Sequence, residues 1–357
     1  MAPPRRAEGH LARRTPGQGA ILLVMRGILL SEAMAQRHAA LLARLRDPAA
    51  SDGDPVEAVL IPEGESGVLP EAELASIRAA FISTDVVADP RLERRGFGTA
   101  RRARNLQWLH IGFAGTDTPI FRELMERGVT VTNSSGAAAE PIAQTAIAGM
   151  LALNRDLPRW AALQRKHEWK RGQHAPPDLR GQTMVVLGLG AIGAHVARMA
   201  RAFGLHVIGV RRTPASLEDG IDEWVPPDRL REVLPRADWL AITVPLTPRT
   251  HHLIDAGALA LLPRGAHILN VARGAVIDEA ALIESLRAGH LGGAYLDVFE
   301  VEPLPETSPL WDFPNVIVTP HDSNVSAGNA ARFDAIFAEQ LELWAAGQPL
   351  TRVVREG

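Results

Sequence analysis

The run Met184-Val-Val-Leu-Gly188-Leu-Gly190-Ala-Ile-Gly193 decides how the second half of this chain is expected to fold. Four apolar residues of strand character lead into a Gly-x-Gly-x-x-Gly turn, and a helical pattern follows it. In such a turn, Gly188 permits the tight bend, Gly190 lets backbone N–H groups approach a pyrophosphate, and Gly193 lets the helix pack on the strand. The helix N-terminus then faces the anion with free N–H groups and its positive dipole end. The motif predicts a dinucleotide-binding turn; the alternative is a glycine turn with a structural role alone.

Outward from this turn, the second half of the chain alternates short apolar strands with helical segments. The expected strands are Met184–Leu187, His206–Val210, Trp239–Val244, His267–Val271, Gly293–Val298 and Val316–Thr319. The clearest helices between them are Ala191–Phe203 and Glu279–Ala288. This alternation predicts a parallel sheet with helices on its faces, and six strands match a complete dinucleotide-binding sheet.

The first half of the chain shows the same alternation. Its expected strands are Ile21–Met25, Val56–Ile61, Ala80–Val87, Leu106–Phe113 and Val129–Thr132, and its expected helices include Ser31–Arg46 and Pro70–Ala79. Glu140–His167 is expected to be one long helix, apolar in its first half, and Ser326–Ala346 an amphipathic tail helix. The pattern therefore predicts an α/β protein with two doubly wound parallel sheets.

Length and composition narrow the class of protein. A chain of 357 residues suggests about two domains, and its 46% hydrophobic and 22% charged residues are typical of a globular protein. The sequence has no cysteine, which excludes disulfides, thiolate metal sites and a cysteine nucleophile within it. The net charge is −3, and no apolar run approaches the ~20 residues that span a bilayer. We expect a cytoplasmic protein without a metal site that binds neither nucleic acid nor a membrane.

Two segments are rich in arginine. Residues 1–19 carry Arg5, Arg6, Arg13 and Arg14 against a single acidic residue, Glu8. We interpret them as a disordered, solvated arm, with a targeting peptide as the alternative. Residues 94–104 carry five arginines and are interpreted as a solvated loop or helix face, with an anion or partner patch as the alternative.

The residues that follow the strand His206–Val210 bear on which dinucleotide is bound. A 2′-hydroxyl is usually held by an acidic residue at this strand end. Here the strand is followed by Arg211, Arg212 and Thr213, and the next carboxylate is Glu218. Two guanidinium groups suit a 2′-phosphate, which they can bind bidentately. The pattern favours NADP over NAD, although one arginine that stacks on the adenine while the other is solvated would also fit.

Three charged side chains follow strand ends, where ligands bind in open α/β sheets. They are Arg273 in Asn270-Val-Ala-Arg-Gly274, Glu302 in Leu296-Asp-Val-Phe-Glu-Val-Glu-Pro303, and His321 in Thr319-Pro-His-Asp-Ser-Asn324. Each has a structural alternative: an arginine that caps a helix or pairs at the surface, a solvated glutamate, and a histidine satisfied within a loop or the core.

Taken together, these motifs resemble the D-isomer-specific 2-hydroxyacid dehydrogenase family, which includes glyoxylate/hydroxypyruvate reductases. The resemblance spans residues 80–352 and rests also on Gly112-Phe-Ala-Gly-Thr-Asp117, on residues 133–155 and on Val244-Pro-Leu-Thr-Pro248. It implies that Arg273 binds the substrate carboxylate and carbonyl, and that His321 is the proton donor and acceptor, paired with Glu302. An arginine fork matches a planar carboxylate, and an imidazole can deliver a proton to the carbonyl oxygen near neutral pH.

The same resemblance implies the remaining site residues. The expected cofactor-binding set is Gly188, Gly190, Ala191, Ile192, Gly193, Arg211, Arg212, Thr213, Pro245, Thr250, Ala272 and Asp297. Among these, Asp297 would lie near the nicotinamide carboxamide, and Pro245 and Thr250 beside the adenosine half. The substrate-binding set is Phe113, Ala114, Gly115 and Arg273, although Phe113 could equally be a core residue.

The resemblance also implies a domain layout. At two places, however, the sequence departs from the family pattern. Residues 20–133 plus 325–357 would form a flavodoxin-like substrate domain, residues 134–324 a Rossmann domain inserted in it, and the protein would be a homodimer. Many relatives have a glycine-containing turn after the histidine, whereas here the turn is Asp322-Ser-Asn324, which adds a charge. Gln144 stands where many relatives have glutamate.

The expected reaction is hydride transfer between NADP, or else NAD, and a small 2-oxo or 2-hydroxy acid, and NADPH would favour reduction. Two alternatives stay open. One is a dinucleotide-sensing regulator of the same fold, which can keep the arginine, glutamate and histidine. The other is a formate- or phosphite-type dehydrogenase, although formate-type relatives replace the glutamate that is present here as Glu302. The sequence leaves the identity of the 2-oxo acid open.

Overall fold

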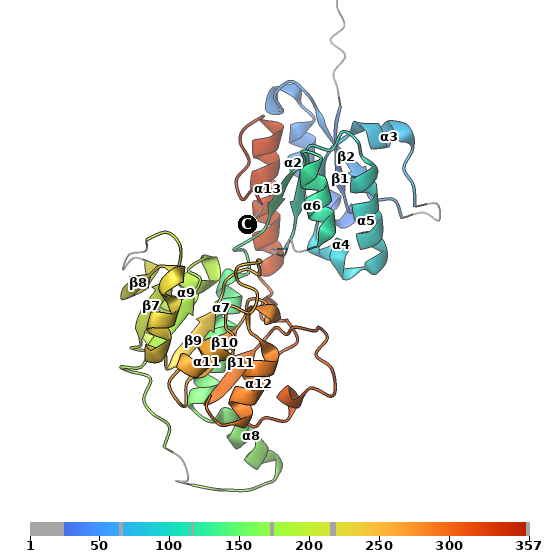
Figure 1. Cartoon of the computed structure of the whole chain (residues 1–357). Helices are drawn as coiled ribbons and strands as arrows, with labels where there is room; N and C mark the ends of the chain where they lie inside the picture. Colours follow the sequence, from blue (N-terminus) through green and yellow to red (C-terminus); the bar gives the residue numbers. More distant parts are fainter. Residues whose placement is uncertain are drawn as a thin grey trace, which may run out of the picture. The chain divides into compact units, whose positions relative to one another are not determined.

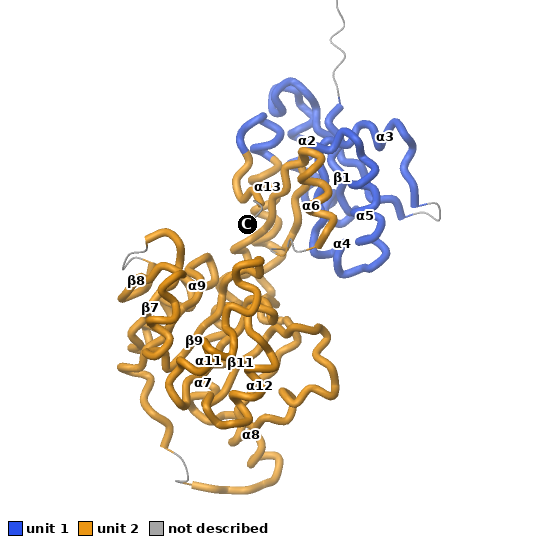
Figure 2. The backbone as a smooth tube through the Cα atoms, in the orientation of Figure 1, with its two compact units in different colours: residues 1–107, 342–349 blue, residues 108–341, 350–357 orange. Residues whose placement is uncertain are grey.

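The structure is a computed structural model that describes residues 25–354, apart from residues 64–66, 114, 116–117, 172–174 and 215–218 (Figure 1). The chain forms two compact units (Figure 2). One comprises residues 1–107 and 342–349, and the other residues 108–341 and 350–357. The domain boundary expected at residues 133/134 stays a prediction. No helix in the described part of the chain is long and apolar enough to cross a membrane.

The first of two sheets has five strands in the order β2-β1-β3-β4-β5, as a flavodoxin-like layout predicts. Its strands are β1 (Arg26–Leu30), β2 (Val56–Leu60), β3 (Ile77–Ile82), β4 (Trp108–Ile111) and β5 (Thr130–Asn133). The helices of this part are α1 (Glu32–Arg37), α2 (Ala39–Leu45), α3 (Glu71–Ser76), α4 (Thr84–Ala88), α5 (Pro90–Arg102) and α6 (Pro119–Glu126). Local signals set several helix starts: Ser31 accepts a hydrogen bond from the Met34 N–H, and Asp89 caps α5 ahead of Pro90.

The second sheet has seven parallel strands in the order β12-β11-β10-β9-β6-β7-β8. They are β6 (Thr183–Leu187), β7 (His206–Val210), β8 (Glu223–Val225), β9 (Trp239–Ile242), β10 (His267–Asn270), β11 (Gly293–Leu296) and β12 (Val316–Val318). The strand order reverses between β6 and β9, which is the place where open α/β sheets bind ligands.

Helices cover both faces of this second sheet (Figure 1). They are α7 (Ala139–Asn154), α9 (Ala191–Ala202), α10 (Leu230–Val233), α11 (Ala256–Leu261) and α12 (Glu279–Arg287). Alternate residues of β6 enter different cores. Val185 packs with residues of α10, α11 and α12, whereas Met184 packs with residues of α7 and α9. Burial on both faces explains why these strands are apolar throughout.

Several expected boundaries were wrong. The strand expected at Ala80–Val87 ends at Ile82, because Ser83 and Thr84 begin α4. The helices expected at Ser31–Arg46 and Pro70–Ala79 are the shorter α1, α2 and α3. The strand expected at Ile21–Met25 lies outside the described residues except for Met25, which belongs to no element. The first described strand is β1 (Arg26–Leu30), of which Ile28–Leu30 are fully buried.

The helix expected at Glu140–His167 is two helices. Asp156 has a left-handed backbone, with φ of +56°, and Pro158 lies in the first turn of α8 (Leu157–Arg165). The break at Asp156 ends α7 after Asn154. Strand β8 was not predicted, because its three residues are too few for a pattern. The arginine-rich residues 94–102 lie on α5, and the tail helix is α13 (Asn329–Ala345).

His110 lies in β4, directly before the Gly112–Gly115 loop, and is fully buried. Its Nδ1 is 2.8 Å from the hydroxyl oxygen of Thr132, and its Nε2 is 3.1 Å from that of Ser134. Burial, with a smaller effect of the charge on Arg352, lowers the pKa of His110 to about 3. The imidazole is therefore neutral in the folded chain at neutral pH.

We predict that His110 makes the fold sensitive to acid. Between pH 6.5 and about 3 the unfolded chain takes up a proton that the folded chain refuses, so the free energy of unfolding falls as the pH drops. The slope is up to about 1.4 kcal/mol per pH unit. Urea unfolding followed by tryptophan fluorescence at several pH values should show a shallower pH dependence for His110→Gln. The exposed control His251→Gln should keep the wild-type dependence, and equal slopes for His110→Gln and wild type would contradict the prediction.

Candidate active site

The candidate residues of the second unit gather at the carboxyl edge of the seven-stranded sheet. Because β6, β9, β10, β11 and β12 run parallel and lie close together in the sheet, the segments that follow them leave the sheet on the same side. Those segments begin at Gly188, Thr243, Val271, Asp297 and Thr319. The sequence separates these segments by up to 130 residues, and the sheet brings them to one edge.

The glycine turn after β6 is shaped by close backbone contacts. Gly188 has a φ of +99°, and a Cβ on it would lie 2.8 Å from Val244 Cγ1. A Cβ on Gly193 would lie 1.9 Å from the carbonyl oxygen of Gly188, so α9 packs on β6 more closely than any side chain allows. The hydroxyl of Thr243 donates to the same carbonyl at 2.6 Å. Thr243 was not singled out from the sequence; it directly precedes the motif that begins at Val244.

Gly190 differs from its two neighbours in this turn. It is the N-cap of α9 with extended backbone, and a Cβ on it would meet no described atom within 4 Å. No side chain caps the helix, so the first N–H groups, those of Ala191, Ile192 and Gly193, have no side-chain acceptor among the described residues. A cradle of this kind fits a pyrophosphate, which N–H groups and the helix dipole would hold.

The two arginines after β7 have different surroundings. The Arg211 guanidinium donates to the carbonyl oxygens of Thr213 at 2.8 Å and Pro214 at 2.6 Å, and it pairs with Asp219 at 3.3 Å. It therefore holds the loop that follows the strand. Arg212 is exposed and makes no hydrogen bond or ion pair with the residues that the structure describes. Within the described residues, only the Arg212 guanidinium of the two is thus available to bind a ligand. The sequence had suggested that both arginines could bind the 2′-phosphate.

The loop after β9 is closed by Thr250. Its hydroxyl donates to the carbonyl oxygen of Pro245 at 2.7 Å and accepts from the N–H of Thr247 at 2.7 Å. This side chain thus fixes the backbone that carries Pro245 beside the glycine turn, since Val244 touches Gly188. Both residues lie at the predicted edge of the sheet.

Arg273 is held by its own loop after β10. Asn270 accepts from the Ala272 N–H at 3.1 Å and donates to the carbonyl of Arg273 at 3.1 Å. The Arg273 side chain donates to the Ala272 carbonyl at 2.8 Å, and a Cβ on Gly115 would lie 3.0 Å from its Nη2. Gly115, in the loop after β4, therefore lies close to the guanidinium.

The other members of that set are placed less fully. Phe113 is half-buried, and its ring lies edge-on to that of Phe121 with centroids 6.4 Å apart. This ring contact is typical of a core residue, which was one of the two roles that the sequence left open for Phe113. Ala114 lies outside the described residues.

His321 and Glu302 form a pair. The imidazole Nδ1 lies 2.8 Å from Glu302 Oε2, while Glu302 Oε1 accepts from the Phe299 N–H at 3.0 Å. Both side chains are partly exposed, at 46% and 37%. The peptide bond from Glu302 to Pro303 is cis, and His321 has a left-handed backbone with φ of +54°. The carboxylate thus orients the ring and leaves Nε2 as the nitrogen available to a ligand.

The turn that carries His321 is organised by Asp297, which is 1% exposed. Its carboxylate accepts from the Thr319 hydroxyl at 2.6 Å, from the Asp322 N–H at 3.0 Å, and from the N–H and hydroxyl of Ser323. The Asp297 carbonyl also accepts from the His321 N–H at 2.8 Å. Sequence reasoning did not single out Thr319 or Ser323, although both lie in the quoted motif around His321.

A second carboxylate cluster holds the segment that carries Glu302. Glu300 Oε1 lies 2.7 Å from His252 Nε2 and accepts from the Glu279 N–H, and Glu279 Oε2 accepts from the Glu300 N–H in return. Burial raises the pKa of Glu279, against the hydrogen bond from the Glu300 N–H, which lowers it. A Cβ on Gly274 would lie 1.8 Å from the Phe299 carbonyl carbon, so the Arg273 loop packs directly on this segment.

The two departures from the family pattern have local roles in the structure. Asn324 accepts at its carbonyl from Asn329, and Asp322 is exposed beside His321. Gln144 donates to Glu140 at 3.2 Å along α7. The residue that follows it, Thr145, donates to the carbonyl of Ser323 at 3.4 Å, which links α7 to the His321 turn.

Comparisons with known proteins find related sequences and structures. Residues 147–323 match the model of the D-isomer specific 2-hydroxyacid dehydrogenase NAD binding domain. A glyoxylate reductase of Korarchaeum cryptofilum is 33% identical over 270 residues, which cover 74% of this chain and 79% of that protein. A D-3-phosphoglycerate dehydrogenase of Methanocaldococcus jannaschii is 36% identical over 255 residues, or 71% of this chain; the chain spans only about half, 48%, of that protein.

A solved structure supports the same relationship over nearly the whole chain. A D-isomer specific 2-hydroxyacid dehydrogenase from Xanthobacter autotrophicus, in complex with NADPH and MES, superimposes with a TM-score of 0.71 at 32% identity. The match covers 92% of this chain and 98% of that one.

We predict that alanine at two glycines of the turn separates folding from dinucleotide binding. Gly193→Ala drives a Cβ into the Gly188 carbonyl and should lower the free energy of unfolding by about 1–3 kcal/mol. Gly190→Ala should leave stability within about 0.5 kcal/mol. Its Cβ fills the cradle, however, and should weaken NADPH binding by about tenfold or more. Thermal unfolding and fluorescence titration with NADPH measure the two effects. Wild-type affinity in Gly190→Ala would remove the turn from the binding site.

Proposed function

We propose a reaction for this chain on the premise that it belongs to the D-isomer specific 2-hydroxyacid dehydrogenase family, whose members are nicotinamide-dependent oxidoreductases. The chain reduces a small 2-oxo acid to a D-2-hydroxy acid. The observation that carries the proposal is the 2.8 Å contact between His321 and Glu302, on a turn at the same sheet edge as Arg273 and the glycine turn. A proton donor, a carboxylate-binding arginine and a dinucleotide cradle are the parts that this reaction requires.

Residues of the glycine turn hold the dinucleotide. The N–H groups of Ala191, Ile192 and Gly193 bind the pyrophosphate, and Gly190 leaves room for it. Pro245, Thr250 and Ala272 line the same edge of the sheet. The nicotinamide supplies the hydride that reduces the 2-oxo carbon. Asp297 acts mainly by holding the His321 turn, because its buried carboxylate is already engaged by Thr319 and Ser323.

Arg273 and His321 act on the substrate. The Arg273 guanidinium binds the substrate carboxylate as a fork, and it stabilises negative charge that develops on the neighbouring carbonyl oxygen. His321 delivers the proton to that oxygen from Nε2, because Nδ1 is committed to Glu302. Glu302 keeps the ring in this orientation through its contact with Nδ1. In the oxidative direction the same nitrogen accepts the proton from the hydroxyl.

The substrate class is a short 2-oxo acid such as glyoxylate or hydroxypyruvate. The chain spans most of the glyoxylate reductase that it matches and about half of the phosphoglycerate dehydrogenase. NADPH is the preferred cofactor, with NADH as the weaker one, and it favours reduction. The Xanthobacter relative binds NADPH, and Arg212 offers a guanidinium to a 2′-phosphate. We also propose residues 20–133 plus 325–357 as the substrate domain and 134–324 as the cofactor domain.

An absorbance assay of NADPH and NADH oxidation tests the reaction class. The substrates are glyoxylate, hydroxypyruvate, pyruvate, phenylpyruvate and 2-oxoisocaproate. Turnover with any of them supports the proposal and ranks the substrates. Absence of turnover in protein that binds NADPH would favour the dinucleotide-sensing alternative, and turnover with formate or phosphite alone would favour the other alternative.

We predict that His321→Gln lowers kcat by about 10²–10⁴, because no other side chain replaces the general acid. The dinucleotide affinity should change little, since the glycine turn is untouched. A matched control is His290→Gln just after α12, where the imidazole hydrogen-bonds to the backbone carbonyl of Leu259. Steady-state kinetics of the three proteins make the comparison. Wild-type turnover in His321→Gln would remove this residue from its role.

We predict that the two arginines after β7 respond differently to alanine. Arg212→Ala should raise the KM for NADPH about 10- to 100-fold, the effect of losing a charge-assisted hydrogen bond, while the KM for NADH stays unchanged. Arg211→Ala should affect both cofactors, because it releases the loop that Arg211 holds. The measurement is KM for each cofactor in both variants. If Arg212→Ala keeps the wild-type cofactor ratio, the 2′-phosphate is held elsewhere.

A further inference from the structure

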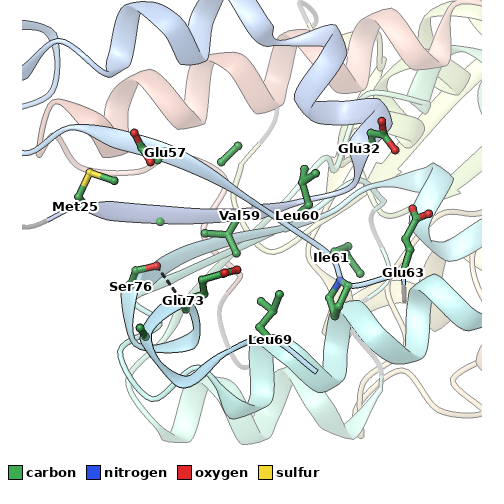
Figure 3. A pocket seen from close by; sticks show the side chains of 14 residues that line it. Met25, Glu32, Glu57, Val59, Leu60, Ile61, Glu63, Leu69, Glu73 and Ser76 are labelled. Carbon is green, nitrogen blue, oxygen red and sulfur yellow. Dashed lines mark hydrogen bonds between the residues drawn. The ribbon is translucent and has the colours of Figure 1, made fainter. Parts of the chain in front are cut away.

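Charge is distributed unevenly over the parts of the chain that the proposed reaction does not use. A groove beside β2 in the first unit is lined by four glutamates and by no arginine or lysine among its described lining residues (Figure 3). The glutamates are Glu32, Glu57, Glu63 and Glu73. A groove with this charge repels a dinucleotide and an acid substrate alike. Arginines, by contrast, meet in the second unit, at the loop that follows β5.

The loop after β5 is held by two guanidinium groups that come from distant parts of the sequence. Arg352 Nη1 donates to the carbonyl oxygen of Ser135 at 2.7 Å, and Arg332 Nε donates to that of Ala137 at 2.7 Å. Gly136 lies between the two carbonyls with a φ of +91°. All of these residues belong to the second unit (Figure 2). Two positive charges are thus anchored on three consecutive residues.

This loop lies against the first residue of α9, where the proposed dinucleotide cradle begins. A Cβ on Gly136 would lie 3.5 Å from Ala191 Cβ and 3.9 Å from Arg352 Nη1. The Arg352 guanidinium and the N-terminus of α9 are therefore neighbours across a glycine that has no side chain to separate them. A phosphate bound by the first N–H groups of α9 would feel this charge, since the Debye length is about 8 Å at physiological ionic strength.

The two arginines of the loop differ in what else they bind. Arg332 also donates from Nη2 to Asn329 Oδ1 at 2.6 Å and to Ser326 Oγ at 3.3 Å. Arg352 is exposed, and the Ser135 carbonyl is the one hydrogen-bond acceptor of its side chain among the described residues. Arg332 is therefore committed to the loop and to α13, whereas most N–H groups of the Arg352 guanidinium are available to an anion.

The backbone of Arg352 is held in a conformation that an arginine does not favour. Its φ is +57°, in the left-handed region that glycine and asparagine adopt more readily. Pairing with β5 fixes the chain there, because the Val354 N–H donates to the Val131 carbonyl at 2.9 Å and Val353 forms a bridge with Thr132. Backbone strain of this kind persists where the surrounding structure imposes it, and it is found most often at functional sites.

We propose that Arg352 is a further dinucleotide-binding residue, whose guanidinium binds the pyrophosphate at the N-terminus of α9. This inference rests on the proposed binding of the dinucleotide at the glycine turn. Arg352 acts on the part that NADPH and NADH share, whereas Arg212 acts on the 2′-phosphate of NADPH alone. The guanidinium adds a positive charge and charge-assisted hydrogen bonds to the neutral N–H groups of the cradle. It therefore increases the affinity for both cofactors without selecting between them.

Binding of four ligands to the full-length protein separates these roles. NADPH and NADH carry the pyrophosphate, ADP carries it without the nicotinamide, and 2′-AMP lacks it but keeps the 2′-phosphate. Arg352→Asn removes the charge and suits the left-handed backbone, so the variant should fold like wild type. Arg352→Lys keeps the charge, and Arg332→Gln is the matched control on the same loop. Fluorescence titration gives Kd for NADPH and NADH, competition with NADPH gives it for the other two, and thermal unfolding checks each variant.

We expect Arg352→Asn to raise the Kd of NADPH, NADH and ADP about tenfold, because a charge-assisted interaction with the pyrophosphate is lost. The Kd of 2′-AMP should not change. Arg352→Lys should stay within about threefold of wild type for every ligand, since it keeps the charge but not the guanidinium fork. Arg332→Gln should leave all four affinities at the wild-type level, and Arg212→Ala should weaken NADPH and 2′-AMP alone.

Unchanged affinity for NADH and ADP in Arg352→Asn would overturn this inference alone and leave the proposed function intact. An equal loss of 2′-AMP binding in that variant, or an equal loss of all ligands in Arg332→Gln, would assign the effect to the shape of the loop and overturn it as well. Wild-type protein that binds neither NADPH nor ADP would overturn the proposed function and this inference together.

Discussion

The close contact between Gly193 and the carbonyl of Gly188 is the constraint on which the proposed active site depends. No Cβ fits between them, so α9 begins close to the end of β6, and no side chain caps its first N–H groups. Thr243 donates to the same carbonyl from the end of β9, which joins the two strands at the point where the sheet order reverses. The loops after β9 and β10 are placed relative to that junction.

A second constraint is the buried carboxylate of Asp297. A charge that is 1% exposed is costly unless hydrogen bonds satisfy it, and here Thr319 and the backbone and hydroxyl of Ser323 do so. The turn cannot open without leaving that charge unpaired, so His321 keeps its left-handed backbone and its contact with Glu302. Contact between Gly274 and Phe299 extends the same rigid arrangement to the Arg273 loop.

Most strands of both sheets could be predicted because burial on one or two faces leaves a pattern in the sequence. The errors occur where that pattern continues across a change of structure. Val86 and Val87 resume the apolar pattern shortly after Ile82, yet Ser83 and Thr84 turn the chain into a helix. Helical residues run past Asn154, yet Asp156 adopts a left-handed backbone. Strand β8 has three residues, too few to show a hydrophobic pattern in the sequence. It is a strand because it pairs with β7.

By itself, the sequence determined the two α/β sheets and the dinucleotide turn, because hydrophobic periodicity and glycine spacing are local. Arg273, Glu302 and His321 follow strand ends, and the sequence offers them as candidates through the resemblance of their motifs to the family. Only the tertiary structure decided which side chains support them. Asp297 with Ser323, Glu300 with His252, and Arg211 with Asp219 are contacts between residues 8 to 48 positions apart in the sequence. Local periodicity carries no information about such pairs, since they exist only when the parallel strands bring their carboxyl ends to one edge.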